Sequence, residues 1–295
     1  MRERVRTFAA TPGRLLVVSD FDGTLAPIVL DPMGARIERA ARVALRRLAR
    51  VSTATPDRLS LAVLSGRTAR DVAARVRVGG IRYLGNHGLE QGLLPRGAPA
   101  ERLDVVPVAG VAHDPGAARR VGVALAARLG RPAWLFVEDK NPSVAFHFRQ
   151  APDPAAARSS VLAALSEMGL PESLEAIEGR QVVEIRPHGA GGKGAALDRL
   201  LSAVRPAAVL AMGDDVSDAE AFRSIAQARS TGAIDALIIA VHGAAETPLE
   251  VVEAADLLIS APREAARILG ELARRLAGES DAMRGPAAAA AEELI

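Results

Sequence analysis

Short apolar runs recur along the chain, and most are followed by a polar turn and a segment whose apolar residues have helical spacing. The runs predict strands at residues 15–19, 59–64, 81–84, 207–212 and 236–241. Helical spacing appears at residues 37–50, 68–77, 219–229 and 262–276. Strands that alternate with helices are typical of an α/β fold. We therefore predict a Rossmann-like parallel sheet with helices on both faces.

The middle of the chain has a different pattern, in which a helix and a hairpin occur twice. Helices are predicted at residues 114–130 and 153–169, each beginning at Asp-Pro and ending at Gly. Strands are predicted at residues 133–140, 144–149, 173–178 and 181–186. This αββαββ order predicts an α+β cap domain, residues 103–186, inserted into a core of residues 1–102 and 187–285. The Ala-rich residues 286–295 are expected to form a flexible C-terminal tail, as a frayed helix or as disordered chain.

Composition narrows the class of protein. A length of 295 residues favours two domains or one large one, and 49% hydrophobic residues indicate a globular chain. Because Cys is absent and the N-terminus has no signal-like apolar segment, we expect a cytoplasmic protein without disulfides or thiolate metal sites. No apolar run approaches the roughly 18 residues of a membrane-spanning helix. A net charge of +2 and 3% aromatic residues argue against nucleic-acid binding. We expect a monomer whose partner is a small-molecule substrate, with no nucleic-acid or membrane partner.

The first candidate for chemistry is the run Asp20-Phe21-Asp22-Gly23-Thr24, at the end of the first predicted strand. Open α/β sheets bind their ligands at the carboxyl ends of their strands. Two acids spaced in this way suit phosphoryl transfer. The first acid attacks phosphorus and the second protonates the leaving oxygen, with a magnesium ion between them.

Two further motifs suit anion binding. Ser65-Gly66-Arg67 follows the second predicted strand, where a hydroxyl and backbone N–H groups form an anion cradle. Lys193 follows a glycine-rich turn and precedes a helix. Lys193 and Lys140 are the only two lysines among 37 basic residues. Their retention in a chain that otherwise uses Arg suggests that both positions need a compact ammonium group. The alternative for Ser65-Gly66-Arg67 is an ordinary strand–helix turn. The alternatives for the lysines are chance and, for Lys193, a solvated position at the start of a helix.

An acidic cluster follows the predicted strand 207–212. It contains Asp214, Asp215 and Asp218. Two unit charges 4 Å apart repel by about 4 kcal/mol at an effective dielectric constant near 20. A hard divalent cation relieves such repulsion, and carboxylate oxygens suit Mg²⁺. The alternative is an acidic cap for the helix that follows, which explains Asp218 well and Asp214 poorly.

The order of these four motifs resembles that of the haloacid dehalogenase-like phosphohydrolases. The resemblance implies that Asp20 is a nucleophile that forms an aspartyl-phosphate and that Asp22 is the general acid and then the base. It implies that Lys193 is catalytic too. Phosphate binding is implied for Ser65, Gly66, Arg67 and Lys193, and Mg²⁺ binding for Asp20, Asp22 (through its carbonyl), Asp214, Asp215 and Asp218, the last two through water.

The predicted cap strands have one apolar and one charged face, because side chains alternate along a strand. Glu138 and Lys140 share a face of the first strand, and Glu184 and Arg186 share a face of the last. A charged face over the acidic site would offer hydrogen bonds to sugar hydroxyls. An ordinary solvated face is the alternative. Trp134 and Phe136 fall on the charged side, which this pattern does not explain without a bulge.

Residues 137–149, together with residues 85–88, 182–187 and 213–218, resemble the motifs of the trehalose-6-phosphate phosphatases. The resemblance covers residues 14–275. It implies that the cap contacts the two glucose units, and the matching positions are Asn86, His87, Glu138, Lys140, Ser143, Arg149 and Glu184. Phe148 stands where the family usually has Tyr, and Ala219 stands where it usually has Glu.

The resemblance implies Mg²⁺-dependent hydrolysis of trehalose 6-phosphate to trehalose and phosphate. One alternative is a phosphatase for sucrose phosphate or mannosyl-phosphoglycerate, against which Glu138-Asp139-Lys140 argues. A second alternative is a non-catalytic sugar-phosphate sensor. Such a sensor is expected to have lost Asp20, Asp22 or Lys193, all of which are present.

Overall fold

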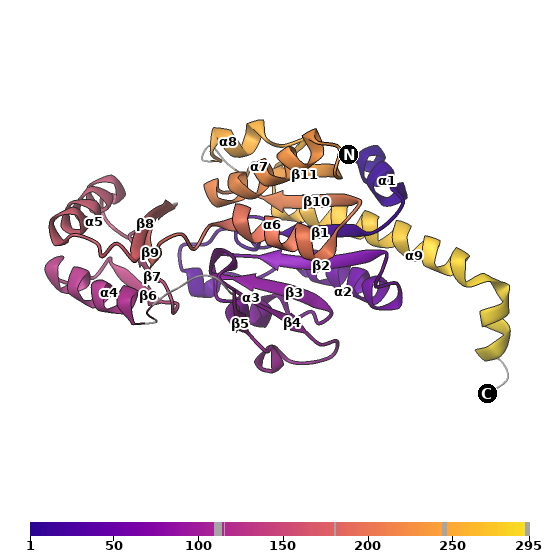
Figure 1. The fold of residues 1–295 in the computed structure, drawn as a ribbon, viewed down its shortest axis with the longest axis horizontal. Coiled ribbons are helices and arrows are strands. Elements are labelled where there is room, and N and C mark those ends of the chain that lie inside the picture. The colour runs from indigo at the N-terminus through magenta and orange to yellow at the C-terminus, as the bar shows by residue number, and fades with distance from the viewer. Residues whose placement is uncertain (109–113, 115, 180, 244–246, 293–295) are drawn as a thin grey trace.

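The computed structural model describes residues 1–108, 114, 116–179, 181–243 and 247–292, which form two separate sheets (Figure 1). The larger sheet has eight strands in the order β12-β11-β10-β1-β2-β3-β4-β5. Its strands are β1 (Leu15–Ser19), β2 (Leu59–Leu64), β3 (Ile81–Gly85), β4 (Glu90–Leu94), β5 (Val106–Pro107), β10 (Ala208–Gly213), β11 (Asp235–Val241) and β12 (Leu257–Ile259). Neighbours from β12 to β3 are parallel, whereas β4 and β5 pair antiparallel. The predicted α/β class is confirmed.

Strand β1 lies between β2 and β10, and its side chains point alternately into two apolar layers, one on each face of the sheet. Leu15 and Val17 belong to one buried cluster, while Leu16 and Val18 belong to the other. The first layer is covered by α1 (Arg2–Ala10), α2 (Arg39–Ala54), α3 (Ala69–Val76) and α9 (Pro262–Glu292), and the second by α6 (Lys193–Val204), α7 (Val216–Ser230) and α8 (Leu249–Glu253). Burial on both faces explains why β1 is a continuous apolar run rather than an alternating one.

The smaller sheet is antiparallel, with the order β6-β7-β9-β8. Its strands are β6 (Phe136–Asp139), β7 (Val144–His147), β8 (Leu174–Gly179) and β9 (Val182–Pro187). Helices α4 (Ala117–Arg128) and α5 (Pro154–Met168) pack on one face, around a core that includes Phe146, Phe148 and Ile185. The predicted αββαββ order is therefore confirmed. Phe148 lies in this apolar core, where the hydroxyl of the usual Tyr is absent.

The chain passes between the two sheets near the predicted positions, though not at them. Val106–Pro107 pairs in the larger sheet, and Pro187 still belongs to the smaller one. The division into core and cap domains stays a prediction. So does the flexibility of residues 286–295, of which 286–292 lie in α9 and 293–295 lie outside the described residues.

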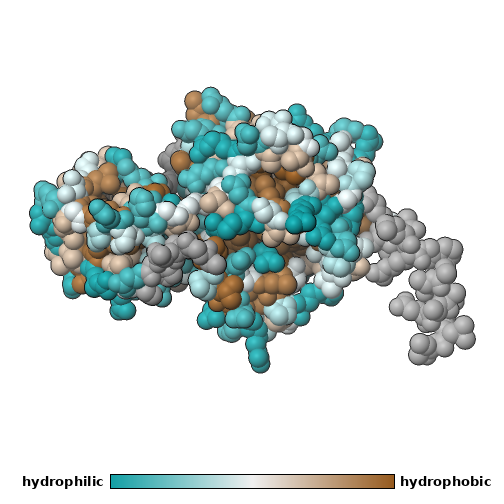
Figure 2. Space-filling view, in the orientation of Figure 1, coloured by the Kyte–Doolittle hydropathy of each residue, from teal (hydrophilic) through white to brown (hydrophobic). Residues whose placement is uncertain are grey.

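The two sheets and their helices form two rounded masses with polar residues over much of the face shown in Figure 2. Three short 3-10 turns, Pro32–Gly34, Asn86–Gly88 and Ala100–Arg102, lie in the larger mass. Among the described residues, we find no helix with the length and apolarity needed to cross a bilayer.

Candidate active site

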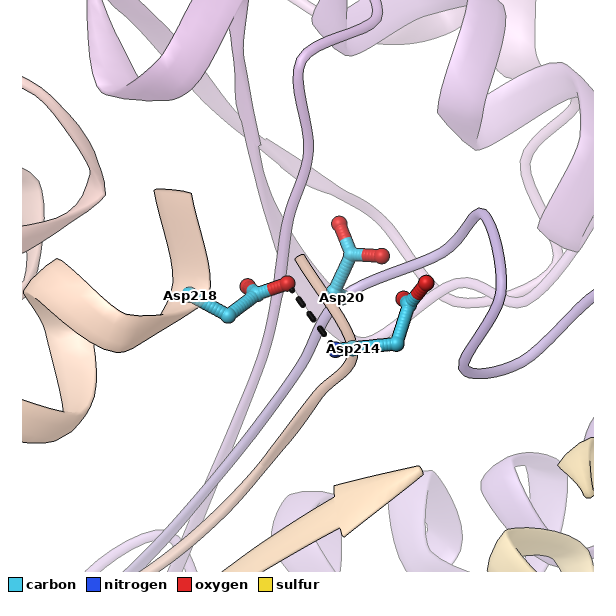
Figure 3. Close-up of side chains that lie close together, drawn as sticks. All are labelled: Asp20, Asp214 and Asp218. Carbon is cyan, nitrogen blue, oxygen red and sulfur yellow. Dashed lines mark hydrogen bonds between the residues drawn. The ribbon is translucent and has the colours of Figure 1, made fainter. Parts of the chain in front are cut away.

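The carboxyl ends of β1 and β10 bring the predicted acids together. The two strands pair in register, from Leu15 with Ala208 to Ser19 with Met212, so the residues that follow them meet at one edge of the sheet. Asp20, Asp214 and Asp218 are buried, and each offers an oxygen within 4.8 Å of the others. Figure 3 shows the three carboxylates around one small space.

Lys193, at the start of α6, is buried between two of these acids. Its Nζ donates to Asp20 Oδ1 at 2.6 Å and to Asp218 Oδ1 at 2.8 Å. Burial alone would lower the pKa of Lys193, but the Asp20 and Asp218 carboxylates raise it, so the ammonium stays charged. Burial raises the pKa of Asp20 to about 8, because the attraction of Lys193 is opposed by the nearby charges of Asp218 and Asp22.

Asp214 is held by the first motif. Thr24 Oγ1 donates to Asp214 Oδ1 at 3.0 Å. Burial, followed by repulsion from Asp20 and Asp218, raises the pKa of Asp214 well above its ordinary value. Gly23 has a φ of +80°, and a Cβ on it would lie 2.0 Å from Asp214 Oδ2. Glycine at this position is therefore required both by the backbone and by the approach of the carboxylate.

Asp218 and Asp215 form the helix cap that the sequence offered as an alternative. Asp218 Oδ2 accepts from the backbone N–H groups of Asp214 and Asp215, each at 3.1 Å. Asp215 Oδ1 accepts from Val216 N at 2.7 Å, and Asp215 and Asp218 form a capping box at the start of α7, in which the side chain of each accepts from the backbone N–H of the other. With Lys193 on its other oxygen, Asp218 already accepts three hydrogen bonds. It therefore orients Lys193 and the Asp214 turn.

Asp22 is paired with Arg67, a contact that sequence reasoning missed. Arg67 Nε donates to Asp22 Oδ2 at 2.6 Å and Nη2 donates to Asp22 Oδ1 at 2.8 Å. Arg67 also donates to Asp71 at 3.1 Å and to the Pro32 carbonyl at 2.8 Å. These acids raise the pKa of Arg67 against the effect of its burial. The side chain predicted to bind phosphate is thus occupied by carboxylates here.

The turn after β3 packs on the Ser65–Arg67 loop. His87 N donates to the Ser65 carbonyl at 2.9 Å, and Asn86 N donates to the Arg67 carbonyl at 2.7 Å. Both Asn86 and His87 have a φ near +50°, which lets the chain turn back on the loop. Ser65 is buried, and its Oγ accepts from Arg67 N at 3.2 Å.

Residues from the smaller sheet complete the site on the opposite side. Lys140 Nζ donates to Glu184 Oε2 at 3.0 Å and to the Gly66 carbonyl at 2.9 Å. His87 Nε2 lies 3.5 Å from the same Glu184 oxygen. Burial opposes ionisation, but Lys140 lowers the pKa of Glu184 well below its ordinary value. Glu184 in turn raises the pKa of Lys140 despite its burial.

Three buried polar atoms lie at this junction without a hydrogen-bond partner among the described residues. They are Asn86 Oδ1, Ser143 Oγ and Glu184 Oε1. The amide of Asn86 points its nitrogen at the Lys140 carbonyl, at 3.2 Å, which leaves the oxygen free. Farther out, His147 Nε2 lies 2.9 Å from Glu138 Oε2, and Arg149 Nη1 donates to the Val29 carbonyl at 2.8 Å.

A cavity of about 400 Å³ connects these groups. Most predicted site residues line it, namely Asp20, Asp22, Gly66, Arg67, His87, Glu138, Lys140, Arg149, Glu184, Lys193, Asp214 and Asp215. Ser65, Asn86, Ser143 and Asp218 are buried without lining it. Both lysines of the chain face the same cavity, which supports the reading of lysine as a site residue over chance.

Comparison with known proteins identifies the family of this chain. The family model for trehalose-phosphatase matches residues 18–250. The chain belongs to the trehalose-phosphatase family. A trehalose-phosphate phosphatase from Mycobacterium avium is 36% identical over 214 residues, which are 71% of this chain and 51% of that protein. This trehalose-phosphatase family member thus spans about half the length of that relative.

Solved structures agree with the fold of a trehalose-phosphatase. The C-terminal domain of Candida albicans trehalose-6-phosphate phosphatase has a TM-score of 0.73 and 21% identity, over 92% of this chain and 96% of that one. A haloacid dehalogenase-like hydrolase from Bacteroides thetaiotaomicron has a TM-score of 0.57 and 16% identity, over 86% and 98%. The predicted haloacid dehalogenase-like fold with a cap is confirmed.

Sequence reasoning missed the apolar part of the cavity in this family member. The residues that line it include Ile28, Val29, Leu30, Met33, Trp134 and Phe136. The signal available was the position of Trp134 and Phe136 on the charged side of their strand. Trp134 lies in the turn before β6, which is shorter than the predicted strand, and no bulge accounts for Phe136, because Phe136 to Asp139 pair with His147 to Val144 without interruption.

Proposed function

We propose that this chain is a Mg²⁺-dependent phosphatase that hydrolyses trehalose 6-phosphate to trehalose and phosphate, as a step of trehalose biosynthesis. The observation that carries the proposal is that one cavity is lined both by Asp20, Lys193 and Asp214 and by Glu184 and Lys140. The first group suits a phosphate and the second suits sugar hydroxyls. The name of the Mycobacterium avium relative supports the same substrate.

The acidic cluster fits a divalent cation. Asp20, Asp214 and Asp218 are three buried carboxylates with oxygens within 4.8 Å of one another, and the one ammonium hydrogen-bonded in this cluster is that of Lys193, which bonds to Asp20 and Asp218. We assign Asp20, Asp214 and the Asp22 carbonyl as direct ligands and Asp215 as a ligand through water, while Asp218 acts on Lys193. Bound Mg²⁺ supplies positive charge that stabilises the phosphoryl group during transfer.

In the first step, an Asp20 oxygen forms a bond to phosphorus as the bond from phosphorus to the sugar oxygen breaks. Lys193 and the backbone N–H groups of the Ser65–Arg67 loop balance the charge on the phosphoryl oxygens. Asp22 gives a proton to the leaving sugar oxygen. Both oxygens of Asp22 accept from Arg67 in this structure, so Asp22 has to leave this pair as substrate phosphate draws Arg67 away.

In the second step, water attacks the aspartyl-phosphate and Asp22 takes the proton of that water. Phosphate leaves, and Asp20 is regenerated as a carboxylate. The two steps need one acid that changes role, which suits a carboxylate at the cavity edge better than a fully buried one. The side chain of Asp22 is 39% exposed, whereas that of Asp20 is 6% exposed.

The proposal is tested by phosphate release from trehalose 6-phosphate, sucrose 6-phosphate, glucose 6-phosphate and mannosyl-phosphoglycerate, with Mg²⁺ and with EDTA. We expect a strong preference for the first substrate and loss of turnover in EDTA. Asp20→Asn is expected to lower turnover roughly a thousandfold or more, whereas Asp198→Asn, exposed on the same helix as Lys193, serves as the matched control. Equal activity across the panel would refute the substrate, and an active Asp20→Asn variant would refute the nucleophile.

A further inference from the structure

A second cavity, of about 300 Å³, lies away from the acidic site. Its walls come from the second half of α2, the segment between α3 and β3, and the turn that follows β4. Strand β3 is parallel to β2 and β1, and β4 is antiparallel to β3. These walls therefore lie at the amino ends of the parallel strands, whereas Asp20 follows the carboxyl end of β1. Among the described residues, none lines both cavities.

The second cavity, called here the arginine pocket, has four exposed arginines in its wall, namely Arg46, Arg50, Arg77 and Arg96. Within the part of the chain that the structure describes, no carboxylate lines the pocket and none pairs with these four side chains. Arginines elsewhere do pair with acids, as Arg75 does with Asp71 and Arg186 with Glu175. The pocket therefore concentrates positive charge in a chain whose net charge is only +2.

Two glycines bring the wall segments together. Gly80 has a φ of +80°, and a Cβ on it would lie 3.2 Å from Arg96 Cγ and 3.5 Å from Ala49 Cβ. A Cβ on Gly79 would lie 2.2 Å from the Pro95 carbonyl oxygen, so a side chain there would displace the turn after β4. The arginines are thus gathered by close packing of segments that are distant in the sequence.

The repulsion within this cluster acts on the neighbouring Arg42. Its guanidinium donates to the Val76 carbonyl at 3.1 Å and to the Arg75 carbonyl at 3.2 Å, at the C-terminal end of α3. Burial lowers the pKa of Arg42, and the charges of Arg77 and Arg46 lower it further. Helix α2 contains no acid and five arginines, namely Arg39, Arg42, Arg46, Arg47 and Arg50. Like charges four residues apart destabilise a helix, and a bound anion would remove that repulsion.

We propose that the arginine pocket binds a small anion with at least two phosphoryl groups, of the diphosphate class. Guanidinium groups present forked N–H donors that match phosphate oxygens two at a time, and they stay charged at physiological pH. One phosphate monoester carries a charge of about −1.5 to −2, so two phosphoryl groups match four cations better than one does. The volume lies at the lower end of the roughly 300–1,000 Å³ that is usual for small-ligand sites. This inference does not rest on the proposed function, because the two cavities are separate.

Calorimetric titration of the full chain with pyrophosphate tests the pocket directly. EDTA is present, so that no Mg²⁺ carries the probe to the acids around Asp20. The double variant Arg46→Gln/Arg50→Gln removes two charges from the pocket, and the matched control, Arg39→Gln/Arg47→Gln, removes two from the same helix outside it. We expect the first variant to raise the Kd at least about tenfold and the second to change it within about threefold. Orthophosphate should bind the wild type at least about tenfold more weakly than pyrophosphate does.

Three outcomes of this titration would overturn the proposal. Equal weakening in both double variants would show a general attraction to a basic surface. Unchanged binding in both would show that the probe binds elsewhere, for example in the active cavity. Orthophosphate that binds as tightly as pyrophosphate would remove the diphosphate class.

Thermal unfolding separates binding from folding. Without ligand, Arg46→Gln/Arg50→Gln should melt no more than about 3 °C below the wild type, because it removes repulsion rather than an ion pair. A larger fall would overturn the proposal, since these arginines would then stabilise the free protein. Arg96→Gln, in the turn after β4, is the variant outside α2 and should raise the Kd for pyrophosphate about threefold or more. A wild type that does not bind pyrophosphate, or an Arg96→Gln variant that binds it as the wild type does, would also overturn the pocket.

Discussion

The two lysines of this chain line one cavity, and the groups around them, called here the Lys193 end and the Lys140 end, are incomplete in different ways. Lys193 is bonded to Asp20 and Asp218 and lies near Asp214, so one ammonium faces three buried carboxylates. Burial first, and then repulsion between the carboxylates, raises the pKa values of Asp20 and Asp214. This end lacks positive charge.

At the other end, charge is nearly balanced and hydrogen bonds are missing. Lys140 and Glu184 form a buried pair in which each favours the charged form of the other. The atoms left over are Asn86 Oδ1, Ser143 Oγ and Glu184 Oε1. A buried polar atom without a partner costs about 1–3 kcal/mol. The contrast fits the proposed function, in which the first end would hold a cation and a phosphate and the second would bind hydroxyl donors.

The largest expected effect separates the two lysines directly. Lys193→Met removes the ammonium from the phosphoryl group and should lower kcat about 10²–10³-fold on every phosphomonoester. Lys140→Met should lower kcat/KM roughly tenfold for trehalose 6-phosphate, and much less for glycerol phosphate, which has no ring to bind. Steady-state phosphate release on both substrates measures this. Equal losses from Lys140→Met on the two substrates would contradict the division of roles.

The next effect concerns the buried ion pair of Lys140 and Glu184. Glu184→Gln leaves Lys140 charged and buried, so it should cost about 3 kcal/mol of unfolding free energy at pH 7. Because the pKa of Glu184 is lowered in the folded protein, its stabilisation is present above about pH 4.5 and is lost as pH falls through the folded value. The difference in unfolding free energy between the wild type and Glu184→Gln should therefore narrow below pH 4.5.

Denaturant unfolding of both proteins between pH 7 and pH 3 measures this difference in unfolding free energy. Glu178→Gln, which removes a half-exposed partner of Arg158 in the same sheet, is the control and should change little at any pH. A gap for Glu184→Gln that stays constant across this range would show that the pair is not the source of the stability.

The smallest effect distinguishes two acids of the unbalanced end. Asp214→Asn removes a proposed ligand and should weaken Mg²⁺ binding about 10–100-fold. Asp218→Asn should lower kcat while the Mg²⁺ concentration at half-maximal activity changes within about threefold, because Asp218 is already bonded to Lys193 and two backbone N–H groups. Mg²⁺ titration of activity and calorimetry compare the two variants. The reverse ranking would make Asp218 the ligand.

Much of the core could be predicted from the sequence because local pattern and chemistry coincide there. Strands β1, β2 and β10 are buried on both faces, so each is an apolar run followed at once by a polar motif. Strands β4 and β5 were missed, because β4 is polar along half its length and β5 has two exposed residues. Helix α1 was missed because only three of its residues are buried.

The site divides in the same way. Motif positions identified Asp20, Lys193 and Asp214, since strand ends converge in any parallel sheet. The pairing of Arg67 with Asp22 depends on rotamers and on the approach of two loops, which spacing does not encode. The position of Asn86 depends on the contact of its amide with the Lys140 carbonyl, which joins the two sheets. The parity of Phe136 was visible in the sequence, but the apolar residues that line the cavity with it come from the distant segment between β1 and α2.

The contact of Lys140 with the Gly66 carbonyl has a consequence for entry and exit. Together with the bond from Asn86 to the Lys140 carbonyl, it fastens an edge strand of the smaller sheet to the loop that follows β2. Separation of the two sheets at this point would break both bonds and would expose the charges of Lys140 and Glu184 to water together. Water solvates both ions, which offsets part of the cost of separation. The Lys140 ammonium thus both joins the two sheets, through the Gly66 carbonyl, and balances the charge of Glu184.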